Sequence, residues 1–444
     1  MRLGDLRGCR IGVLGYGREG RAAIGALRAH GADTDLSVLV ESGPVPDDLP
    51  VKVGPFAGQQ LDFDVLVRSP GVPVLHPALL RYREAGGRVL NPASLWFAER
   101  PELPVIGVTG SKGKSTTASL LAQLLAVSGR QVLLAGNIGV PLLDHLETSA
   151  DVVVLELSSY QLTDLQGRLA MGLITRLFPE HGDWHGGVAH YYASKLRLAE
   201  LLNGGPLLVN ATDPVLVAQT KALAGRILAN QPPLVHRRND ALYLADQPLV
   251  SAADIQLPGR HNLDNAALAL EAAMRFGERL DGLLPALRMF RPLRDRLEIV
   301  RDQDGVAWVN DSIATTPHAT LAALQAFSGR RVILIAGGYV RPADWSPVLA
   351  HCTAEPLHGL VVMPDSGPAI ARIFADAVAA PKAGICQVGD LAAAVQAAMG
   401  MIGDQAVILL SPGAASFPQF RDFEDRGEQF RRAVAACYKE RSTA

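Results

Sequence analysis

Short, continuous apolar runs recur along this chain, each followed by a glycine-rich or polar loop and then by an amphipathic segment. The runs cover residues 10–14, 37–40, 63–67, 151–156, 306–309, 331–335, 359–362 and 406–410. Strands of this composition are buried on both faces, so the pattern predicts an α/β fold of parallel sheets covered by helices. Proline-rich breaks at 92–103 and 291–296 indicate linkers. We therefore expect three domains, over residues 1–93, 94–295 and 296–444.

The segment from Pro104 to Thr117 joins an apolar run to the sequence Thr-Gly-Ser-Lys-Gly-Lys-Ser-Thr, and a helix with leucines at 120, 121, 124 and 125 follows. Such a loop lets backbone N–H groups converge on phosphate oxygens at a helix N-terminus. The strict G-x4-G-K-[ST] pattern is missed by one residue, but an ordinary glycine turn would leave the Gly-Lys-Ser-Thr run unexplained. We expect Lys114 to reach the β- and γ-phosphates of a ligand and a hydroxyl of Ser115 or Thr116 to hold Mg²⁺. The other loop residues expected at the phosphates are Gly110, Ser111, Lys112 and Gly113.

A second glycine pattern, Gly15-x-Gly17-x-x-Gly20, follows the first apolar run. It is moderately specific for nucleotide phosphates, and a short turn that merely needs glycines is the competing interpretation. No acid is clearly placed to hold an adenosine ribose, although Glu41 could be argued, so the pattern does not predict NAD. A third loop, Ser69-Pro70-Gly71, follows the run at 63–67.

Polar side chains follow several of the other predicted strands. Glu156 ends one of them, 42 residues after Lys114, and a role on Mg²⁺ is favoured over a structural acid. The segment 178–187 is rich in ligand-type residues, including His181, but a polar surface turn has the same composition. Lys195 lies in a predicted helix and, taken alone, would be solvated. Asp311 and Thr315 follow the run at 306–309, where acids commonly meet nucleotides.

Asn262 and Asn265 lie at i and i+3 where a helix is predicted to begin. Capping of the helix explains one asparagine, whereas two on one face suggest hydrogen bonds to a ligand.

Composition narrows the possible partners and the compartment. A net charge of −2 argues against nucleic acid or an anionic membrane surface as the main partner, so any phosphate site must be built locally. The four cysteines are scattered without metal-ligand spacing, which is typical of reduced cytosolic thiols. The N-terminus lacks a signal peptide and no apolar run approaches 18 residues, so we expect a cytoplasmic protein.

Together these motifs resemble the muramyl ligase family, cytoplasmic ATP-dependent amide-forming enzymes of peptidoglycan synthesis, and within it the branch that adds glutamate to UDP-N-acetylmuramoyl-L-alanine. The resemblance covers the whole chain. It rests on the strings Thr109-Gly-Ser-Lys-Gly-Lys-Ser-Thr116, Gly136-Asn-Ile-Gly-Val-Pro141, Glu156-Leu-Ser-Ser-Tyr-Gln161, Gly259-Arg-His-Asn262, Asn310-Asp-Ser312 and Ser411-Pro-Gly-Ala-Ala-Ser416.

The resemblance implies a Rossmann-like UDP-binding first domain, a central P-loop ATPase domain and a Rossmann-like C-terminal domain. It places Lys114, Lys195, His181 and Asn137 in catalysis and implies two Mg²⁺ sites, held by Ser115, Glu156, His181 and a carbamylated Lys195. The UDP group would meet Gly15, Gly17, Arg18, Glu19, Ser69, Pro70 and Gly71. ATP would also meet Asn262, Asn265, Arg296 and Asp311. A monomer is expected.

Two departures from the family pattern fall in the amino-acid pocket. The glutamate-adding branch has a lysine where this chain has Ile313, and a lysine-bearing loop where this chain has Gly337-Gly-Tyr-Val-Arg-Pro-Ala-Asp-Trp345. The change indicates altered substrate choice, and we expect L-glutamate, with an epimerase acting later on the product. The pocket residues expected are Ile313, Thr315, Tyr339, Arg341, Ser416 and Phe423.

Four alternatives stay open: an ordinary D-glutamate ligase, a paralogue using a neutral amino acid, a folylpolyglutamate synthase, and a non-catalytic nucleotide-binding paralogue. The UDP-type first domain disfavours the folate enzyme. Intact Glu156, His181 and Lys195 speak against the non-catalytic paralogue.

Overall fold

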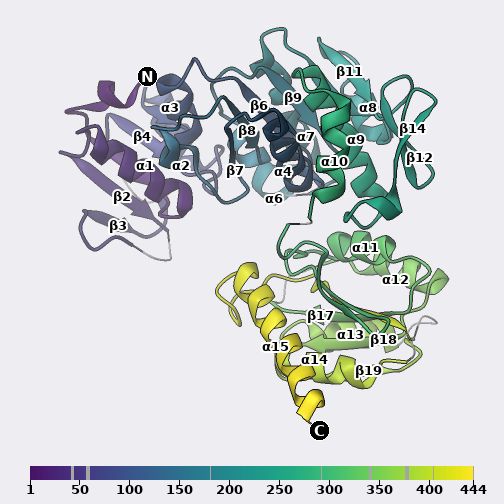
Figure 1. Cartoon of the computed structure of the whole chain (residues 1–444). Helices are drawn as coiled ribbons and strands as arrows, with labels where there is room; N and C mark the ends of the chain where they lie inside the picture. The colour runs from purple at the N-terminus through teal and green to yellow at the C-terminus, as the bar shows by residue number, and fades with distance from the viewer. Residues whose placement is uncertain are drawn as a thin grey trace. The chain divides into compact units, whose positions relative to one another are not determined.

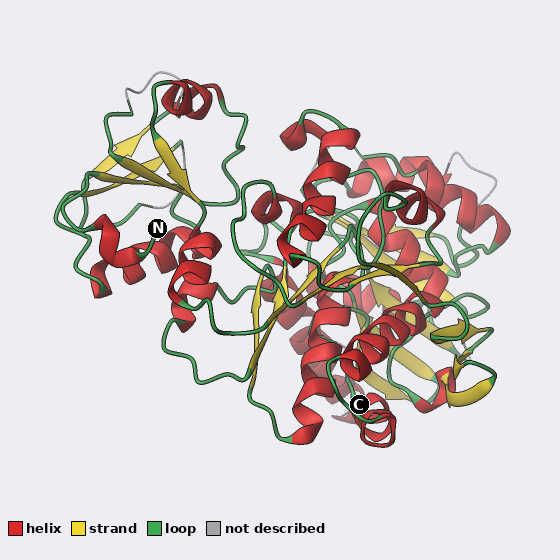
Figure 2. Cartoon of the chain, turned by 90° about the horizontal axis from the view of Figure 1, so that it is seen from above, coloured by secondary structure: helices red, strands yellow, loops and turns green. Residues whose placement is uncertain are grey.

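The computed structural model describes residues 1–41, 45–56, 61–180, 182–291, 293–339, 343–375, 380–403 and 405–443. These residues fall into two compact units. The first unit contains Met1–Ile255 and Asn262–Phe290, and the second contains Gln256–His261 and Arg291–Ala444. Strands and helices alternate along each unit (Figures 1 and 2), as the apolar pattern predicts, and the α/β fold class is confirmed.

The first unit opens with a parallel sheet in the order β3-β2-β1-β4-β5. Its elements are β1 (Ile11–Leu14), α1 (Arg18–Ala29), β2 (Leu36–Val40), β3 (Val51–Val53), β4 (Val65–Arg68), α2 (Pro77–Glu84), β5 (Arg88–Leu90) and α3 (Pro92–Glu99). Strand β4 differs from the predicted run at 63–67, because it begins two residues later and includes Arg68. The charge of Arg68 hid this position from an apolar pattern, although its side chain is fully buried.

A second parallel sheet follows in the same unit, in the order β11-β10-β9-β6-β8-β7. Its strands are β6 (Val105–Thr109), β7 (Val132–Gly136), β8 (Val152–Glu156), β9 (Met171–Ile174), β10 (Leu207–Asn210) and β11 (Arg226–Ala229). The helices are α4 (Lys114–Leu125), α5 (Ser159–Leu162), α6 (Gly182–His185), α7 (Val188–Leu196), α8 (Pro214–Gln219), α9 (Arg260–Arg275) and α10 (Leu280–Met289). A small antiparallel sheet contains β12 (Val235–Arg238), β13 (Ala241–Leu244) and β14 (Gln247–Ser251).

One apolar core runs through both parallel sheets of this unit. It includes Ile11 and Val13 of β1, Trp96 of α3, and Val153 and Leu155 of β8. Helix α3 therefore packs into the same core as both sheets. The carboxyl ends of β1 and β4, and those of β6 and β8, lead directly into the predicted site loops, as open parallel sheets require.

The second unit contains a sheet in the order β15-β16-β20-β17-β18-β19, in which β15 runs antiparallel to β16. Its elements are β15 (Glu298–Gln303), β16 (Val306–Asn310), α11 (Pro317–Ala326), β17 (Val332–Gly337), α12 (Ser346–Ala354), β18 (Gly359–Met363), α13 (Gly367–Ala375), β19 (Ile385–Gln387), α14 (Leu391–Gly400), β20 (Ala406–Leu410) and α15 (Phe423–Thr443). Alternate strand residues enter two separate cores. Leu334 and Leu409 pack with α11, α12 and α13, whereas Ile333 and Ile408 pack with α14 and α15.

Throughout the described part of the chain, no helix is both long and apolar enough to cross a membrane.

Candidate active site

The loop between β6 and α4 has a backbone that only glycine can supply. Gly110 has φ +146° and Gly113, the N-cap residue of α4, has φ +88°. A Cβ on Gly110 would collide with the hydroxyl of Thr175, and one on Gly113 would lie 2.5 Å from Oδ1 of Asn265. The Thr175 hydroxyl also donates to the carbonyl of Lys112 at 2.5 Å. Thr175, which follows β9, thus holds the loop over the N-terminus of α4, the arrangement that favours phosphate.

Three side chains of this segment lie at the first turn of α4. Lys114 donates from Nζ to the carbonyl of Ser111 at 3.1 Å, and Ser115 and Thr116 are buried. The loop is also anchored from the opposite side, because the hydroxyl of Ser111 receives a hydrogen bond from the Tyr191 hydroxyl at 2.8 Å. The predicted phosphate-binding residues therefore share one short segment.

Lys195 of α7 is only 2% exposed, so it is not the solvated lysine that its sequence context suggests. Its Nζ donates to the carbonyl of Gly110 at 2.8 Å and lies 4.8 Å from the centre of the Tyr191 ring. Burial, reinforced by the charge of Lys114, lowers the pKa of the Lys195 ammonium well below its ordinary value, although the charges of Glu180 and Glu156 oppose the shift. An amine in this position is readily available in its neutral, nucleophilic form.

Glu156 ends β8 and is completely buried. Its Oε1 accepts a hydrogen bond from Nδ2 of Asn137 at 2.8 Å, whereas Oε2 has no hydrogen-bond partner among the described residues. A buried carboxylate oxygen in this state is costly unless a cation or donor meets it. Carboxylate and hydroxyl oxygens are the ligands that Mg²⁺ prefers, so Glu156 and Ser115 suit the expected ion.

His181 lies outside the described residues. Within those that are described, no cluster of three or more His, Cys, Asp or Glu side chains with metal-binding geometry occurs.

The two predicted asparagines of α9 are both buried, and Asn265 donates to Oδ1 of Asn262 at 3.1 Å. Between them, Asp264 pairs with Arg176 at 2.5 Å and with Arg237 at 2.7 Å. Arg176 directly follows Thr175, and Asn265 lies beside Gly113. The start of α9 is therefore fixed against the phosphate loop by ion pairs that the sequence pattern did not reveal.

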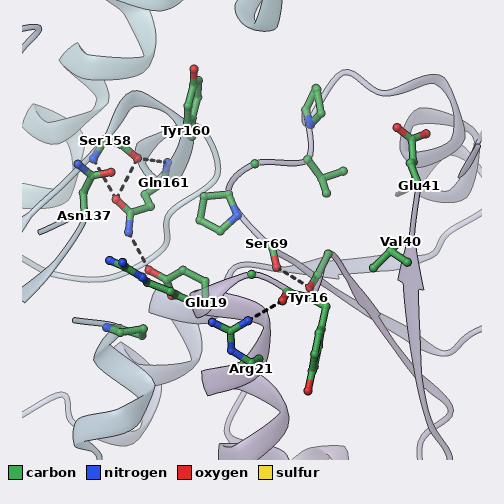
Figure 3. A pocket seen from close by; sticks show the side chains of 18 of the residues that line it. Tyr16, Glu19, Arg21, Val40, Glu41, Ser69, Asn137, Ser158, Tyr160 and Gln161 are labelled. Atoms are coloured by element: carbon green, nitrogen blue, oxygen red, sulfur yellow. Dashed lines mark hydrogen bonds between the residues drawn. The ribbon is translucent and has the colours of Figure 1, made fainter. Parts of the chain in front are cut away.

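A cavity of about 550 Å³ lies at the carboxyl ends of the first sheet (Figure 3). It is lined by all the residues predicted for UDP: Gly15, Gly17, Arg18, Glu19, Ser69, Pro70 and Gly71. Ser69 closes the loop after β4 onto the loop after β1, because its hydroxyl donates to the carbonyl of Gly15 at 3.0 Å. In Figure 3, Val40 and Glu41 border one side, and Asn137, Ser158, Tyr160 and Gln161 border the other. The cavity therefore has walls from both parallel sheets of the first unit.

Glu19 shows how the two walls meet. Nε2 of Gln161 donates to its Oε1 at 3.0 Å, and the two side chains point toward one another in Figure 3. Burial raises the pKa of the Glu19 carboxyl, and the hydrogen bond from Gln161 opposes that rise.

Several cavity residues were missed from the sequence, among them Tyr16, His76, Tyr160 and Gln161. The string Glu156 to Gln161 pointed to the last two, but its sequence did not say that they face the other sheet. Tyr16 lies inside the glycine pattern, which was a usable signal, whereas no pattern in the sequence pointed to His76.

In the second unit, the loops after β16, β17 and β20 contact one another. The N–H of Gly413 donates to the carbonyl of Ala314 at 2.9 Å, and the N–H of Tyr339 donates to the carbonyl of Ala415 at 2.9 Å. The predicted pocket residues on these loops differ in exposure: Ser416 is buried, Ile313 and Phe423 are half-buried, and Thr315 and Tyr339 are exposed. Arg341 lies outside the described residues.

Asp311 is buried among partners of its own unit. Its carboxylate accepts from the hydroxyl of Ser411 at 2.9 Å and from the N–H of Leu297 at 3.3 Å. Arg296, the other nucleotide residue predicted here, precedes Leu297 and is half-buried.

A buried arginine that the sequence analysis did not single out holds the same loops. Arg426 of α15 donates to the hydroxyl and carbonyl of Ser312 at 3.0 and 2.7 Å, and to the carbonyl of Ala414 at 3.1 Å. Burial lowers the pKa of its guanidinium to about 10, and the charge of Asp311 opposes the shift.

Two domain families match the chain: residues 108–273 match the Mur ligase middle domain, and residues 295–413 match the Mur ligase glutamate ligase domain. Over 449 residues the chain is 38% identical to the UDP-N-acetylmuramoyl-L-alanine--L-glutamate ligase of Xylella fastidiosa, which covers 97% of this chain and 96% of that protein. The chain belongs to the Mur ligase family. Another Mur ligase with the same name, from a Micromonospora species, is 41% identical over 98% of both chains.

The family resemblance read from the motifs is thus confirmed. Mur ligases are ATP-dependent enzymes that form amide bonds in peptidoglycan synthesis, and this chain is an enzyme of that class.

Solved structures share the Mur ligase fold at low identity. The UDP-N-acetylmuramate-alanine ligase of Thermotoga maritima superposes with a TM-score of 0.58 at 17% identity, covering 97% of this chain and 99% of that one. The folylpolyglutamate synthase of Mycobacterium tuberculosis, solved with ADP, gives a TM-score of 0.60 at 15% identity, covering 76% and 92%. At such identities the likeness concerns the fold alone.

Proposed function

We propose that this Mur ligase uses ATP to join glutamate, with L-glutamate preferred, to UDP-N-acetylmuramoyl-L-alanine. The observation that carries the proposal is the position of Asn137. Asn137 lines the 550 Å³ cavity, and its side-chain amide donates a hydrogen bond to the buried carboxylate of Glu156 beside the phosphate loop. A substrate whose nucleotide end occupies the cavity would therefore present its other end to the phosphate-transfer centre. The two relatives described above, named for this substrate and for L-glutamate, support the assignment.

In the proposed arrangement, each part of the chain has its own ligand. Residues 1–93 form the UDP-binding domain, 94–295 the ATP-binding domain, and 296–444 the domain that supplies the amino-acid pocket and closes over the nucleotide. Asn262, Asn265, Arg296 and Asp311 complete the nucleotide contacts. We further propose that the protein is a cytoplasmic monomer. Sedimentation at micromolar concentration would test the monomeric state.

Two Mg²⁺ ions would be held by Ser115, Glu156, His181 and Lys195. Of these, Lys195 donates to the carbonyl of Gly110 in the phosphate loop, and Ser115 lies in the first turn of α4. Bound Mg²⁺ would neutralise charge on the transferring phosphoryl group. Lys114 would carry part of the same task with its ammonium. Asn137 would orient Glu156 by the hydrogen bond that it already donates.

Lys195 suits this centre only after a change of charge, because a buried ammonium would repel a metal ion. Its lowered pKa supports reaction of the neutral amine with CO₂. The nitrogen lone pair forms a bond to carbon and one proton is released, so that the side chain becomes an anionic carbamate. The hydrogen bond from Nζ to the carbonyl of Gly110 would keep this group beside the phosphate loop.

The proposed reaction proceeds through an acyl phosphate. An oxygen of the alanyl carboxylate attacks the γ-phosphorus of ATP, and the bond to the β–γ bridging oxygen breaks to release ADP. The acyl phosphate is attacked at its carbonyl carbon by the amine of glutamate. Phosphate leaves the tetrahedral intermediate, a proton leaves the nitrogen, and the amide remains. Exclusion of water protects the acyl phosphate from hydrolysis.

The preference for L-glutamate rests on the amino-acid pocket. Ile313 stands at a half-buried position where the family pattern has a lysine, so the cation of that lysine is missing here. A ligand carboxylate buried at this position without a partner would be strongly destabilised. We propose that Arg341, Thr315 and Ser416 hold the carboxylates instead, with Tyr339 and Phe423 lining the pocket. Arginine offers a bidentate fork that lysine lacks. A later epimerase would then invert the added residue.

The deciding experiment compares kcat/KM for L-glutamate and D-glutamate, with ATP and UDP-N-acetylmuramoyl-L-alanine saturating. We expect L-glutamate to win by orders of magnitude, and Arg341→Ala to raise the KM for glutamate. A preference for D-glutamate would identify an ordinary D-glutamate ligase with unusual loops. Absence of phosphate release from ATP in the presence of the muramoyl substrate and either enantiomer would instead point to the non-catalytic paralogue.

A further inference from the structure

Arg68 is the last residue of β4, and its side chain is 0% exposed. From Nη1 it donates to three backbone acceptors of the following loop: the carbonyls of Ser69 at 3.2 Å, Pro70 at 3.2 Å and Val72 at 2.6 Å. All three residues line the 550 Å³ cavity. Pro70 and Pro73 follow two of these carbonyls and have no N–H, so only the peptide group between Pro70 and Gly71 carries one. Because a peptide group is planar, anchoring the Pro70 carbonyl also fixes the direction of the Gly71 N–H. One guanidinium nitrogen thus holds three carbonyls of this loop.

The other nitrogens of Arg68 hold the opposite wall. Nε and Nη2 form a fork on the carboxylate of Asp164, at 2.9 and 2.7 Å, and Nη2 also donates to the carbonyl of Tyr160 at 3.1 Å. Asn91 extends the connection, because its side chain donates to Asp164 at 2.7 Å and to the carbonyl of Gln161 at 3.0 Å. Tyr160 and Gln161 both line the cavity. The two walls are therefore joined through one ion pair between the buried Arg68 and the partly buried Asp164.

Stability alone is a weak explanation for this arrangement. Burying an arginine and an aspartate carries a desolvation cost, and well-packed apolar residues are often as stable in such positions. The hydrogen bonds of Arg68 have fixed directions. Its planar guanidinium binds one carboxylate through two nitrogens and also donates to backbone carbonyls, a geometry that lysine cannot reproduce.

We propose that Arg68 is a positioning residue for the nucleotide-sugar substrate. It holds the loop 69–72 and the Tyr160–Gln161 segment at the separation that the UDP-bearing substrate requires, and it acts on binding of that substrate without touching the phosphate-transfer centre. The inference rests on the proposed function, since it concerns the same cavity.

The test uses variants that keep size and hydrogen bonding as far as possible. Arg68→Lys retains one positive charge but loses the fork, and Asp164→Asn retains the shape but loses the charge. Arg83→Ala is the matched control. Arg83 lies 3.7 Å from the same carboxylate of Asp164, but its hydrogen bond goes to the carbonyl of Val74.

Steady-state kinetics are measured for each substrate in turn on the full-length enzyme. Arg68→Lys and Asp164→Asn are expected to raise the KM for UDP-N-acetylmuramoyl-L-alanine about tenfold or more, equivalent to about 1.4 kcal/mol. The KM for ATP and kcat should stay within about threefold, as should all constants of Arg83→Ala. Calorimetric titration with UDP alone should give the same ranking of variants. The Tm of each variant shows whether it is folded.

Two results would overturn the role of Arg68 while leaving the proposed function intact. One is an unchanged KM for the muramoyl substrate in folded Arg68→Lys and Asp164→Asn. The other is an equal loss for both substrates together with a lowered Tm, which would identify a structural residue only. If the wild-type enzyme does not use the muramoyl substrate at all, the proposed function fails, and the role of Arg68 fails with it.

Discussion

The centre around the phosphate loop and the loop cluster of the second unit both contain buried charged groups, but in different states. At the phosphate loop, Glu156 keeps one carboxylate oxygen without a hydrogen-bond partner among the described residues, and the pKa of Lys195 is far below its ordinary value. In the second unit, the carboxylate of Asp311 accepts two hydrogen bonds, and Arg426 donates to Ser312 and Ala414.

The difference separates two uses of buried polarity. A buried polar or charged group that lacks a hydrogen-bond or ion-pair partner destabilises the free protein. Its burial becomes favourable when an ion or substrate supplies the missing partner. A group whose partners come from its own unit shapes loops and is satisfied without a ligand. We therefore expect substitutions at the first centre to affect catalysis most. In the second unit, substitutions of groups that only hold the loops together, such as Ser411, should affect mainly stability.

The largest expected effect is at Lys195. Lys195→Ala should lower kcat roughly 10³-fold, as the loss of a central electrostatic group does. Acetate or formate should restore part of the rate, because a small carboxylate can occupy the space of the carbamate. Lys195→Met, which fills that space without a charge, should be inactive and not rescued, whereas Lys221→Ala at an exposed position should behave as wild type. An active Lys195→Ala enzyme without added acid would remove the carbamate from the mechanism.

An intermediate effect is expected at Glu156. Glu156→Gln keeps an oxygen that accepts a hydrogen bond from Asn137 but loses the negative charge. The Mg²⁺ concentration for half-maximal activity should therefore rise at least 10–100-fold. Residues that only hydrogen-bond to metal ligands already lower metal affinity or activity by that factor when they are substituted. Glu271→Gln is the matched control. That buried carboxylate is held by Arg275 at 2.8 Å and by the N–H of Val235 at 3.3 Å. It should lower the Tm without altering the Mg²⁺ dependence. An unchanged Mg²⁺ requirement in Glu156→Gln would argue for a structural acid.

The smallest effect is expected in the second unit. Ser411→Ala removes a donor to the buried Asp311, so the free energy of unfolding should fall by about 1–3 kcal/mol, with kcat within about threefold of wild type. Ser366 provides the control, because its hydroxyl is buried with no hydrogen-bond partner within the described ranges. Ser366→Ala should be neutral or stabilising in the same denaturant titration. A large loss of kcat in Ser411→Ala with little loss of stability would contradict the proposed division between the two regions.

The sequence predicted those features that depend on local pattern. Continuous apolar runs identified many of the buried strands, although β9 and β10, which are also buried, were not among them. The glycines at 110 and 113 identified a loop whose φ angles are unfavourable for other residues. Asn262 and Asn265 lie on one face of α9, as predicted, because residues at i and i+3 are neighbours on a helix surface. Their contact with a ligand stays a prediction.

Features that depend on contacts between distant segments were not predicted. The sequence could not show that Arg68 faces Asp164, because a charged residue after an apolar run ordinarily ends a strand. For the same reason Lys195 read as a solvated lysine, and only burial by Gly110 and Tyr191 gives it unusual chemistry. The ion pairs of Asp264 depend on Arg176 and Arg237, which lie on other elements. Partner identity in such networks is decided by the assembled fold.

The connection between Arg68 and Asp164 also has a consequence for biosynthesis, since 96 positions separate the two residues. A ribosome that adds about 5–20 residues per second needs on the order of 5–20 s to synthesise that interval. The strands of the first sheet all precede Pro92, whereas the acidic partner of Arg68 is translated much later. During that delay the guanidinium at the end of β4 lacks the carboxylate of Asp164, and the cavity lacks the wall that contains Tyr160 and Gln161. A nascent chain that carries every glycine of the first nucleotide loop is therefore still without a finished substrate site.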